Sequence, residues 1–360
     1  MAIDTSFEIK NKVVVFVMLS FSLVTFGQDN QLSTLAKSPQ VNLQERTCAG
    51  VKHNNTDATR KKSSEDKLSE EEYLIKLSKD YPTVSTTNDA NFLGVPNNGT
   101  MHIEMKEGYN MVGNPYPSGV NVHNFIDSNE TINGTLYFLD KVNTDVAATS
   151  YATLTKIAYV SNSNKEDLSI GYFKAGDESN WFINTAQGFF VKATSDSKLI
   201  FTNSMRRITQ ANPDFLNSQT AIPFKGLYWL NMTKNNGVYS QMAVGYSPDC
   251  TLAEDKGIDG RNINQDFYLT SLIDGNYYAI QGRPEFTTED IVPLSYRVDV
   301  SGKYTITIDH AVGVFKEGSQ NIYIKDKGTN KLHNLTNDSY TFFSKEGTFV
   351  DRFTIVYKPR

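Results

Sequence analysis

Strict alternation of apolar and polar residues near the C-terminal end constrains the fold of this chain more than any other feature. The alternation recurs in short runs, at Tyr304–Ile308, Ile322–Ile324 and Phe353–Tyr357. Successive side chains of a strand point to opposite faces, so each run buries one face of a sheet and leaves the other in water. Glycine and asparagine separate the runs every ~8–12 residues, which is typical of the turns in an antiparallel sandwich or barrel.

The rest of the chain favours the same fold class. Aromatic residues make up 12% of the 360 residues, and aromatic side chains are enriched in strands. This length accommodates about two domains. We therefore expect an all-β protein with two tandem antiparallel β-sandwich domains of the jelly-roll or immunoglobulin-like kind. They are predicted over residues 97–212 and 223–360, with a linker at 213–222.

Residues 1–27 are predicted to be a secretory signal peptide. Lys10 and Lys12 precede an apolar stretch, Val13–Phe26, that is shorter than the ~20 residues of a membrane-spanning helix. We expect cleavage before Gln28 and an exported protein with no membrane span after cleavage. An uncleaved signal anchor is the alternative.

Residues 28–96 form a polar segment that is expected to be flexible, because it holds too few apolar side chains to offset the entropy of ordering. A short helix is predicted near residues 69–79, where Ser69 can cap the first turn. The segment is either a linker or the remnant of a pro-region. It contains Cys48, and the sequence leaves open whether Cys48 pairs with Cys250.

The charge balance bears on the class of partner. The formal net charge is −5 and acidic and basic residues are interspersed. A mildly acidic surface argues against nucleic acid or an anionic membrane as the main partner.

The sequence contains no recognisable catalytic motif. Its histidines form neither H-E-x-x-H nor a pair at i, i+4, so a helical zinc site is not indicated. The G-x-S-x-G elbow, the P-loop and G-x-G-x-x-G are also missing. We expect no catalytic activity, and we expect His310, which follows a predicted strand, to be structural or exposed.

An acidic loop in the second predicted domain is the best candidate for a metal site. Its oxygen ligands would suit calcium, the only cofactor that we consider, although their spacing differs from that of an EF-hand. A solvated turn is the alternative. The predicted ligands are Asp255, Asp259, Asn262, Asn264 and Asp266.

Aromatic residues offer a second candidate site, for glycans, because flat rings stack on the apolar faces of sugars. On a strand, one member of each adjacent aromatic pair points outward. The alternative is that these rings belong to the core or to ordinary surface. The candidate ligand-binding residues are Trp181, Tyr228, Trp229, Tyr277 and Tyr278.

Several motifs resemble a region of large exported Bacteroidota proteins. They are Gly108–Ser118, Gly134–Phe138, Ala186–Ala193, Phe201–Arg206 and Asp351–Tyr357. The resemblance implies an ancillary β-sandwich region that precedes a C-terminal sorting domain of the type IX secretion system. It therefore implies the secretion machinery as a partner. Proteins with such a region include adhesins, proteases and glycan-degrading enzymes.

The sorting domain itself would begin near Arg360 and is absent from this sequence. The resemblance therefore implies a secreted or outer-surface protein, or a periplasmic one without that domain. We expect a non-catalytic structural or adhesive role, with glycans or extracellular proteins as partners. The alternatives are a carbohydrate-binding accessory module, or the remnant or part of a secreted hydrolase, either a protease or a glycosidase.

Overall fold

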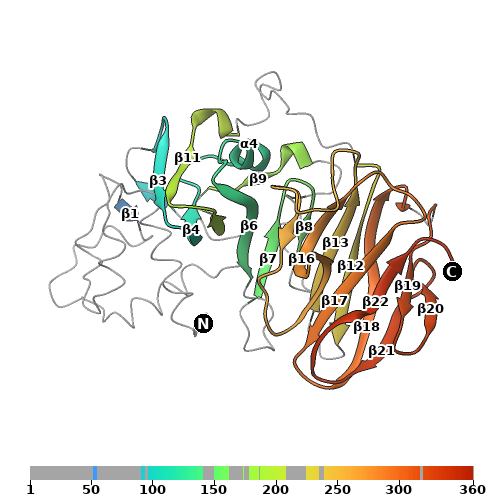
Figure 1. Ribbon diagram of the computed structural model, residues 1–360. Coiled ribbons are helices and arrows are strands. Elements are labelled where there is room, and N and C mark those ends of the chain that lie inside the picture. The colour runs from blue at the N-terminus through green and yellow to red at the C-terminus, as the bar shows by residue number, and fades with distance from the viewer. Residues whose placement is uncertain are drawn as a thin grey trace, which may run out of the picture.

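The computed structural model is built almost entirely of strands, which confirms the all-β class (Figure 1). The predicted signal peptide, most of the polar segment with its helix and Cys48, and the linker at 213–222 lie outside the described residues. The structure describes residues 96–140, 150–161, 173, 178–185, 187–207, 224–234, 239–316 and 319–359, and the short strands β1 (Lys52–Asn54) and β2 (Asn91–Leu93), which pair with each other.

The first β region, within residues 96–207, contains a five-stranded antiparallel sheet and two strand pairs. The sheet has the order β4 (Gly108–Gly113), β10 (Gly188–Ala193), β6 (Ile132–Asp140), β7 (Ser150–Leu154), β8 (Tyr159–Val160). The pairs are β3 (Met101–Met105) with β11 (Ser197–Phe201), and β5 (Val120–Asn121) with β9 (Phe182–Ile183).

A single short α-helix among the described residues, α4 (Val122–Asp127), lies against the core of this region. Asn121 caps it, because its side-chain oxygen accepts a hydrogen bond from the Asn124 amide at 2.9 Å. Phe125 of the helix packs on Phe189 and Phe201, which joins the sheet to the β3–β11 pair. The 3₁₀ turns η2 (Glu178–Asn180) and η3 (Asn203–Met205) complete the region.

The second β region, residues 224–359, is one continuous sheet of 11 strands. Its order is β20 (Lys331–Asn334), β19 (Tyr323–Asp326), β22 (Gly347–Val356), β17 (Ile291–Val298), β15 (Tyr268–Ile273), β16 (Asn276–Arg283), β13 (Tyr239–Tyr246), β12 (Gly226–Lys234), β18 (Gly302–Gly313), β21 (Tyr340–Ser344), with β14 (Gly260–Arg261) added to β16.

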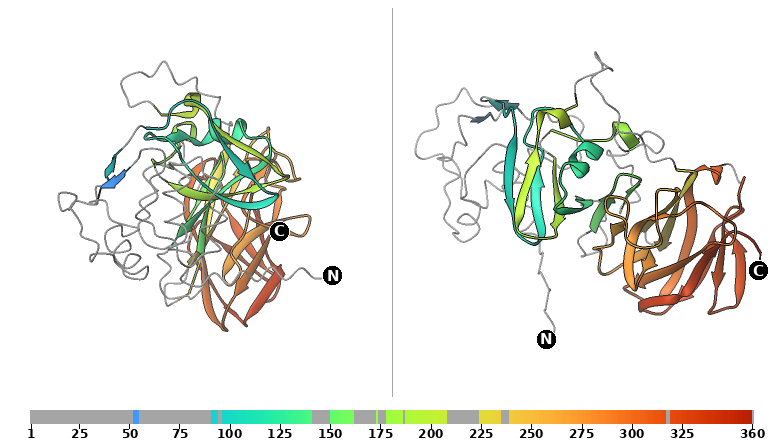
Figure 2. Two further views of the ribbon diagram at one scale, coloured as in Figure 1. Left: turned by 90° about the vertical axis from the view of Figure 1, so that its left-hand side faces the viewer. Right: turned by 45° about the horizontal axis from the view of Figure 1, so that its top comes forward.

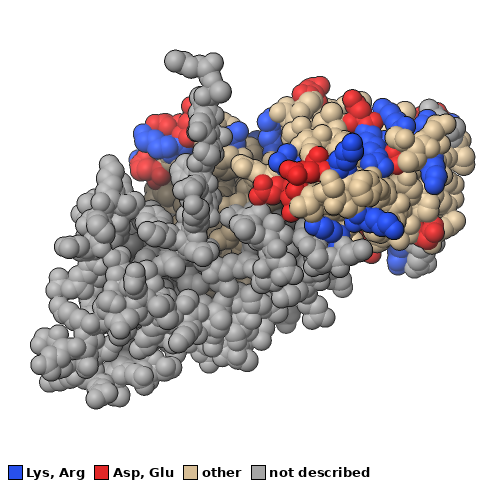
Figure 3. Space-filling model, turned by 90° about the horizontal axis from the view of Figure 1, so that it is seen from below, with Lys and Arg blue, Asp and Glu red and all other residues tan. Residues whose placement is uncertain are grey.

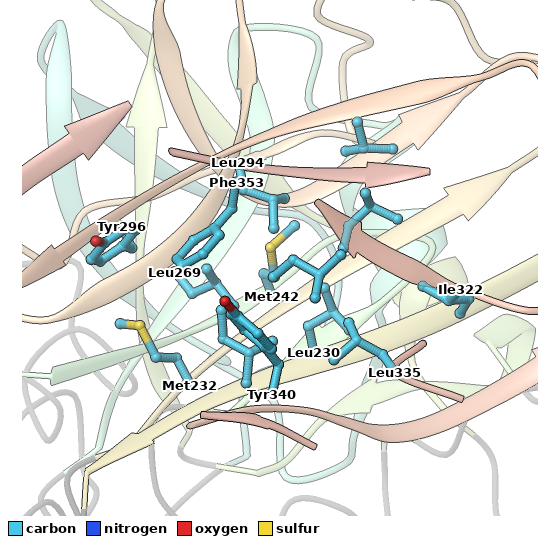
Figure 4. Packing of buried hydrophobic residues seen from close by; sticks show 14 of the residues in the cluster. Leu230, Met232, Met242, Leu269, Leu294, Tyr296, Ile322, Leu335, Tyr340 and Phe353 are labelled. Atoms are coloured by element: carbon cyan, nitrogen blue, oxygen red, sulfur yellow. The ribbon is translucent and has the colours of Figure 1, made fainter. Parts of the chain in front are cut away.

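This sheet curls around a single core, where the sequence predicted two sheets packed face to face. The two end strands, β20 and β21, are joined by the short turn 335–339, so the curled sheet nearly closes on itself. Leu230, Met242, Leu269, Leu294 and Phe353 point toward one another in its interior (Figure 4). All pairings are antiparallel except one: β13 and β16 run parallel, linked by the crossover 247–275.

The polar groups of this core are paired. The hydroxyl of Tyr357 lies 2.8 Å from that of Tyr228 and 2.5 Å from that of Tyr246. Tyr246 in turn donates to Asp290 at 2.7 Å, and Asp290 accepts two hydrogen bonds from Arg283. Because every hydroxyl has a partner, three tyrosines can lie in the core without the cost of unpaired polar groups.

The two β regions meet at a junction with its own apolar cluster (Figure 2). Ile157 and Val160 of the first region pack there with Trp229 and Ile280 of the second. Backbone hydrogen bonds also cross the junction, among them Lys156 to Gly257 at 2.9 Å. Shared apolar burial and backbone bonding fix the two regions to each other.

Two glycines allow the closest approach at the junction. Gly134 and Gly257 both have positive φ angles, +83° and +72°. A Cβ atom on Gly134 would lie 2.5 Å from the Gly257 Cα, which is far inside van der Waals contact. The junction therefore requires glycine at residue 134 both for its backbone angle and for space.

Candidate functional site

A groove of about 370 Å³ runs beside strand β18 in the second β region. Its floor is apolar and consists of Ile308, Ala311, Phe315 and Leu335. Its rim is polar and is formed by Thr307 and by the turn residues 336–339. An apolar floor with a polar rim is the usual composition of a binding site.

The groove exists because β18 is longer than its neighbour β21. The two strands pair only from Gly302, opposite Ser344, to Ile306, opposite Tyr340. Beyond Ile306 no strand among the described residues pairs with this edge of β18. The other edge pairs with β12 along almost the whole length of β18.

Hydrogen bonds hold the turn before β21 away from β18. Leu335 donates its backbone N–H to Ile322 at 2.9 Å, and Thr336 accepts from the Ile322 N–H at 2.9 Å. The Asn334 side chain closes the turn by accepting from the Thr336 N–H at 3.0 Å. The turn is thus tied to the chain segment that leads into β19, and the gap beside β18 stays open.

Asp338 supplies the charge of the groove. It is the one charged residue in the lining, and its side chain is 73% exposed. His333 Nε2 lies 3.1 Å from its carboxylate. The lining contains no lysine or arginine, so the rim favours a cationic ligand group.

A β-bulge lies on the same strand as the groove. The pairing of β12 with β18 passes from Leu230 opposite Ile308 to Tyr228 opposite Ala311. Trp229 therefore faces two residues, Asp309 and His310. Bulges of this kind redirect side chains and are common beside functional sites.

The bulge brings Asp309 and His310 into hydrogen-bond contact. His310 Nδ1 lies 2.6 Å from Asp309 Oδ2, and this bond holds the pKa of Asp309 below its ordinary value. Asn231 donates to the other carboxylate oxygen at 2.8 Å, and it also accepts from Gln241 at 2.9 Å. Within the described part of the chain, no serine, threonine or cysteine side chain bonds to His310, so this pair lacks the nucleophile of a hydrolase triad.

The carboxylates of the predicted calcium loop, Asp255 and Asp259, accept hydrogen bonds from the protein itself. The carboxylate of Asp255 accepts from the N–H of Thr251 at 2.6 Å and from its hydroxyl. Asp259 is buried and accepts from the N–H groups of Asp255 and Gly282 at 2.6 and 2.7 Å. Burial raises the pKa of Asp259 to about 7. These carboxylates hold the loop in shape.

The other predicted calcium ligands also have partners within the protein or are exposed. The Asn262 side chain donates to the Asn264 carbonyl and accepts from its N–H, and the Asn264 side chain bonds in the same two ways to the backbone of Tyr151 across the junction. Asp266 is exposed. The described residues contain no group of three or more His, Cys, Asp or Glu that could hold a metal ion. The loop also links the two β regions through Asn264 and Tyr151, and calcium binding by this loop stays a prediction.

Four of the five aromatic residues predicted to form a glycan platform are buried. Trp181, Tyr228, Trp229 and Tyr278 are each at most 2% exposed, and only Tyr277 is partly accessible. A buried ring offers no face to a sugar. Trp229 does point away from the core of its own sheet, as alternation predicts, but there its indole N–H donates to the Tyr159 carbonyl of the first region at 2.9 Å.

Two of the motifs that carry the resemblance to Bacteroidota proteins, Gly108–Ser118 and Phe201–Arg206, meet at one structural corner. The Asn114 side chain donates to the carbonyls of Ser118, Ile183 and Asn184 at 2.8 to 3.1 Å. Arg206 donates to the Ser118 hydroxyl at 2.9 Å. Asn114 is fully buried, so these motifs fix the fold of the first region rather than a ligand site.

Cys250 has a free and buried thiol, and burial raises its pKa to about 12. Cys48, whose pairing with Cys250 the sequence leaves open, lies outside the described residues. None of the helices in the described ranges is long and apolar enough to cross a membrane.

The sequence analysis did not predict the groove. The alternating run Tyr304–Ile308 reaches the groove floor at Ile308, and the alternation breaks directly after it at Asp309 and His310. The turn-forming residues 334–339 mark the other wall. The sequence does not predict where the pairing of β21 with β18 ends, because this depends on contacts with distant strands.

Residues 29–357 match the family described as a domain of unknown function, DUF8693. The match spans both β regions, the junction and most of the polar segment before them. No curated protein and no solved structure matches the chain. Because the family match covers most of its length, the chain belongs to the DUF8693 family.

Proposed function

We propose that this protein is a non-catalytic, exported structural or adhesive protein that binds an extracellular partner through the groove beside β18. The observation that carries the proposal is the make-up of this groove. It combines an apolar floor with hydroxyl, amide and carboxylate groups on its rim, and its lining holds no nucleophile paired with a base. Such a lining is suited to binding and not to bond cleavage.

The junction between the β regions supports a structural role. A shared apolar cluster and crossing backbone hydrogen bonds hold the two regions in one orientation. A rigid unit presents a binding groove at low entropic cost, because little order has to be gained on binding.

Export is supported by the sequence. The predicted signal peptide at residues 1–27 and the resemblance to exported Bacteroidota proteins point to a location outside the cytoplasm. Charges of both signs are interspersed over the described surface seen from below (Figure 3). No field of one sign there favours nucleic acid.

The test is a binding screen with the purified full-length chain against arrayed extracellular proteins and glycans. We expect saturable binding to a protein, reduced at least tenfold by Asp338→Lys in the groove rim. Asp351→Lys is the matched control, since Asp351 is exposed on β22 and lies outside the groove. Absence of saturable binding, or turnover of any arrayed substrate by the chain, would contradict the proposed function.

A further inference from the structure

We propose that the groove beside β18 binds an extended, basic segment of a partner protein as an added β-strand. This inference rests on the proposed function, and it specifies the class of partner and the mode of binding. The partner segment would pair with the free edge of β18, place an apolar side chain on the groove floor and direct a Lys or Arg toward Asp338.

One edge of β18 has no partner strand among the described residues beyond Ile306. From Thr307 to Gly313 the strand continues to pair with β12 on one side, whereas its pairing with β21 on the other side has ended. Backbone N–H and C=O groups of an inner strand point alternately to its two neighbours. About half of these groups between Thr307 and Gly313 therefore point to the side that has no partner strand among the described residues. The groove lies on this side at Thr307, Ile308 and Ala311, where an incoming strand can accept and donate hydrogen bonds.

The dimensions select a short segment. Seven residues of strand extend over about 23 Å at ~3.3 Å per residue. The volume of about 370 Å³ lies at the small end of the range for ligand sites. The groove therefore fits a few side chains of an extended peptide and not a folded domain.

The bulge limits the length further. A regular ladder along β18 is broken at Asp309 and His310, where Trp229 faces two residues. Bulges on edge strands hinder the addition of long regular strands, which protects a protein from self-association. Pairing is thus confined to short stretches on either side of the bulge, and we expect it to be reversible.

The apolar floor supplies side-chain selectivity. Ile308 and Ala311 are partly buried, and Phe315 and Leu335 belong to the buried core beneath them. Alternate side chains of a paired strand point to the same face. One face of the bound segment would therefore place an aliphatic side chain against this floor.

The charge of the groove predicts a basic residue in the bound segment. Asp338 is exposed at the mouth, and no Lys or Arg in the lining neutralises it. The neighbouring rim residues, Asn337 and Ser339, add neutral polar side chains. A Lys or Arg on the partner would meet a carboxylate there, and an acidic segment would be repelled.

The first experiment measures the free edge directly, without a partner. Hydrogen–deuterium exchange of the purified full-length chain should show fast exchange for a subset of amides between Thr307 and Gly313. Amides of Gly302–Ile306, which lie between two strands, should exchange slowly. Slow exchange throughout 307–313 would mean that the edge is already occupied, and it would overturn the proposal.

The second experiment identifies the ligand class with a displayed library of random twelve-residue peptides. We expect enrichment of sequences that alternate apolar and polar residues and include Lys or Arg. A selected peptide should slow exchange within 307–313. Its affinity should fall at least tenfold on N-methylation of alternate backbone amides, on Asp338→Lys, and on Ala311→Leu, which fills the floor. The control Asp351→Lys should leave the affinity unchanged.

Several outcomes would overturn the proposal. They are enrichment of acidic peptides, failure to enrich any peptide, insensitivity to N-methylation, and insensitivity to both groove variants once circular dichroism shows that they are folded. Self-association of the chain that is lost in Asp338→Lys would assign the groove to a second copy instead. Saturable binding of a protein or glycan that maps outside the groove would overturn this inference while leaving an adhesive role in place.

Discussion

The imidazole of His310 stacks on the indole of Trp229, with ring centroids 3.9 Å apart and an interplanar angle of 16°. The stack forms because the bulge places His310 beside a tryptophan that also bonds to the first β region through Tyr159. One exposed histidine thus covers the ring that links the two β regions.

This stack predicts an energetic coupling between the two rings. In a double-mutant cycle of His310→Ala and Trp229→Phe, the free energy of unfolding should show a coupling of about 0.5–1.5 kcal/mol. Urea unfolding of the four proteins measures it. A cycle of His310→Ala with Trp181→Phe is the control and should give no coupling, because Trp181 belongs to the core of the first region. Equal coupling in both cycles would contradict a specific stack.

The close approach of Gly134 and Gly257 predicts a site that is intolerant of substitution. Gly134→Ala should lower the free energy of unfolding by about 3 kcal/mol or more, since it adds a backbone clash to the strain of a positive φ. Gly275→Ala is a matched control: its φ is +78° but nothing lies within 4 Å of the added Cβ. It should cost only about 1 kcal/mol. Similar losses in the two variants, measured by urea unfolding, would refute the close contact.

The buried carboxyl of Asp259 predicts a stability that declines with rising pH. Burial raises its folded-state pKa from 3.8 to about 7, so the folded protein holds the proton more tightly than the unfolded chain. Its contribution to stability is fully present below about pH 4 and is lost as the pH rises through about 7. The full effect of this pKa difference is about 4 kcal/mol, at about 1.4 kcal/mol per pKa unit.

Urea unfolding at several pH values between 4.5 and 8 tests this prediction. The wild-type free energy of unfolding should fall over this range, and the fall should be smaller in Asp259→Asn, which does not titrate. Asp259→Asn should also be less stable than the wild type at pH 5. Its side-chain NH₂ group would face the backbone N–H of Asp255 or of Gly282, and a donor cannot accept the hydrogen bond that the carboxyl oxygen accepts. An unchanged pH dependence in the variant would disprove the assignment to Asp259.

The ion pair of Asp326 and Arg352 predicts a large loss when one partner is removed. Burial by itself would raise the pKa of Asp326, but two hydrogen bonds from Arg352, at 3.0 and 3.1 Å, and one from Tyr340 keep it below its ordinary value. Arg352→Met should cost about 3–5 kcal/mol, since it leaves a buried carboxylate without its cation.

The control for this pair is Lys106→Met. Lys106 pairs with Asp196 at 2.6 Å, but both side chains are mostly exposed. Water screens such a pair, so the free energy of unfolding should remain nearly unchanged. A comparable loss in both variants, in the same chemical denaturation experiment, would show that burial does not set the strength of the Asp326–Arg352 pair.

The sequence predicted those features that depend on local patterns. Alternation identified the strand that contains Tyr304–Ile308, and the turn residues between strands were read correctly because they act within a few positions. The outward direction of Trp229 also follows from alternation. Its burial does not, because the residues that cover it, Ile157 and Val160, lie ~70 positions earlier in the chain.

The hydrogen-bond partners of the predicted calcium ligands could not be predicted for a related reason. Asp259 and Asn264 have the side chains of calcium ligands, but the fold uses them to bond Gly282 and Tyr151. Whether a polar side chain is free for a ligand depends on which backbone groups lie beside it. For these two residues the partners are 23 and 113 positions away, beyond the range of any local pattern.

The junction has a mechanical consequence. Load applied between the ends of the described chain is carried by the backbone that connects the two β regions, and the contacts of Trp229, Gly257 and the apolar side chains around them share it. Independent domains joined by flexible linkers would rotate freely under tension and unfold one after the other. Here the junction resists rotation of one β region relative to the other as well as their separation. The two regions should therefore resist bending as one rigid body, and the groove beside β18 should keep a fixed orientation relative to the first β region.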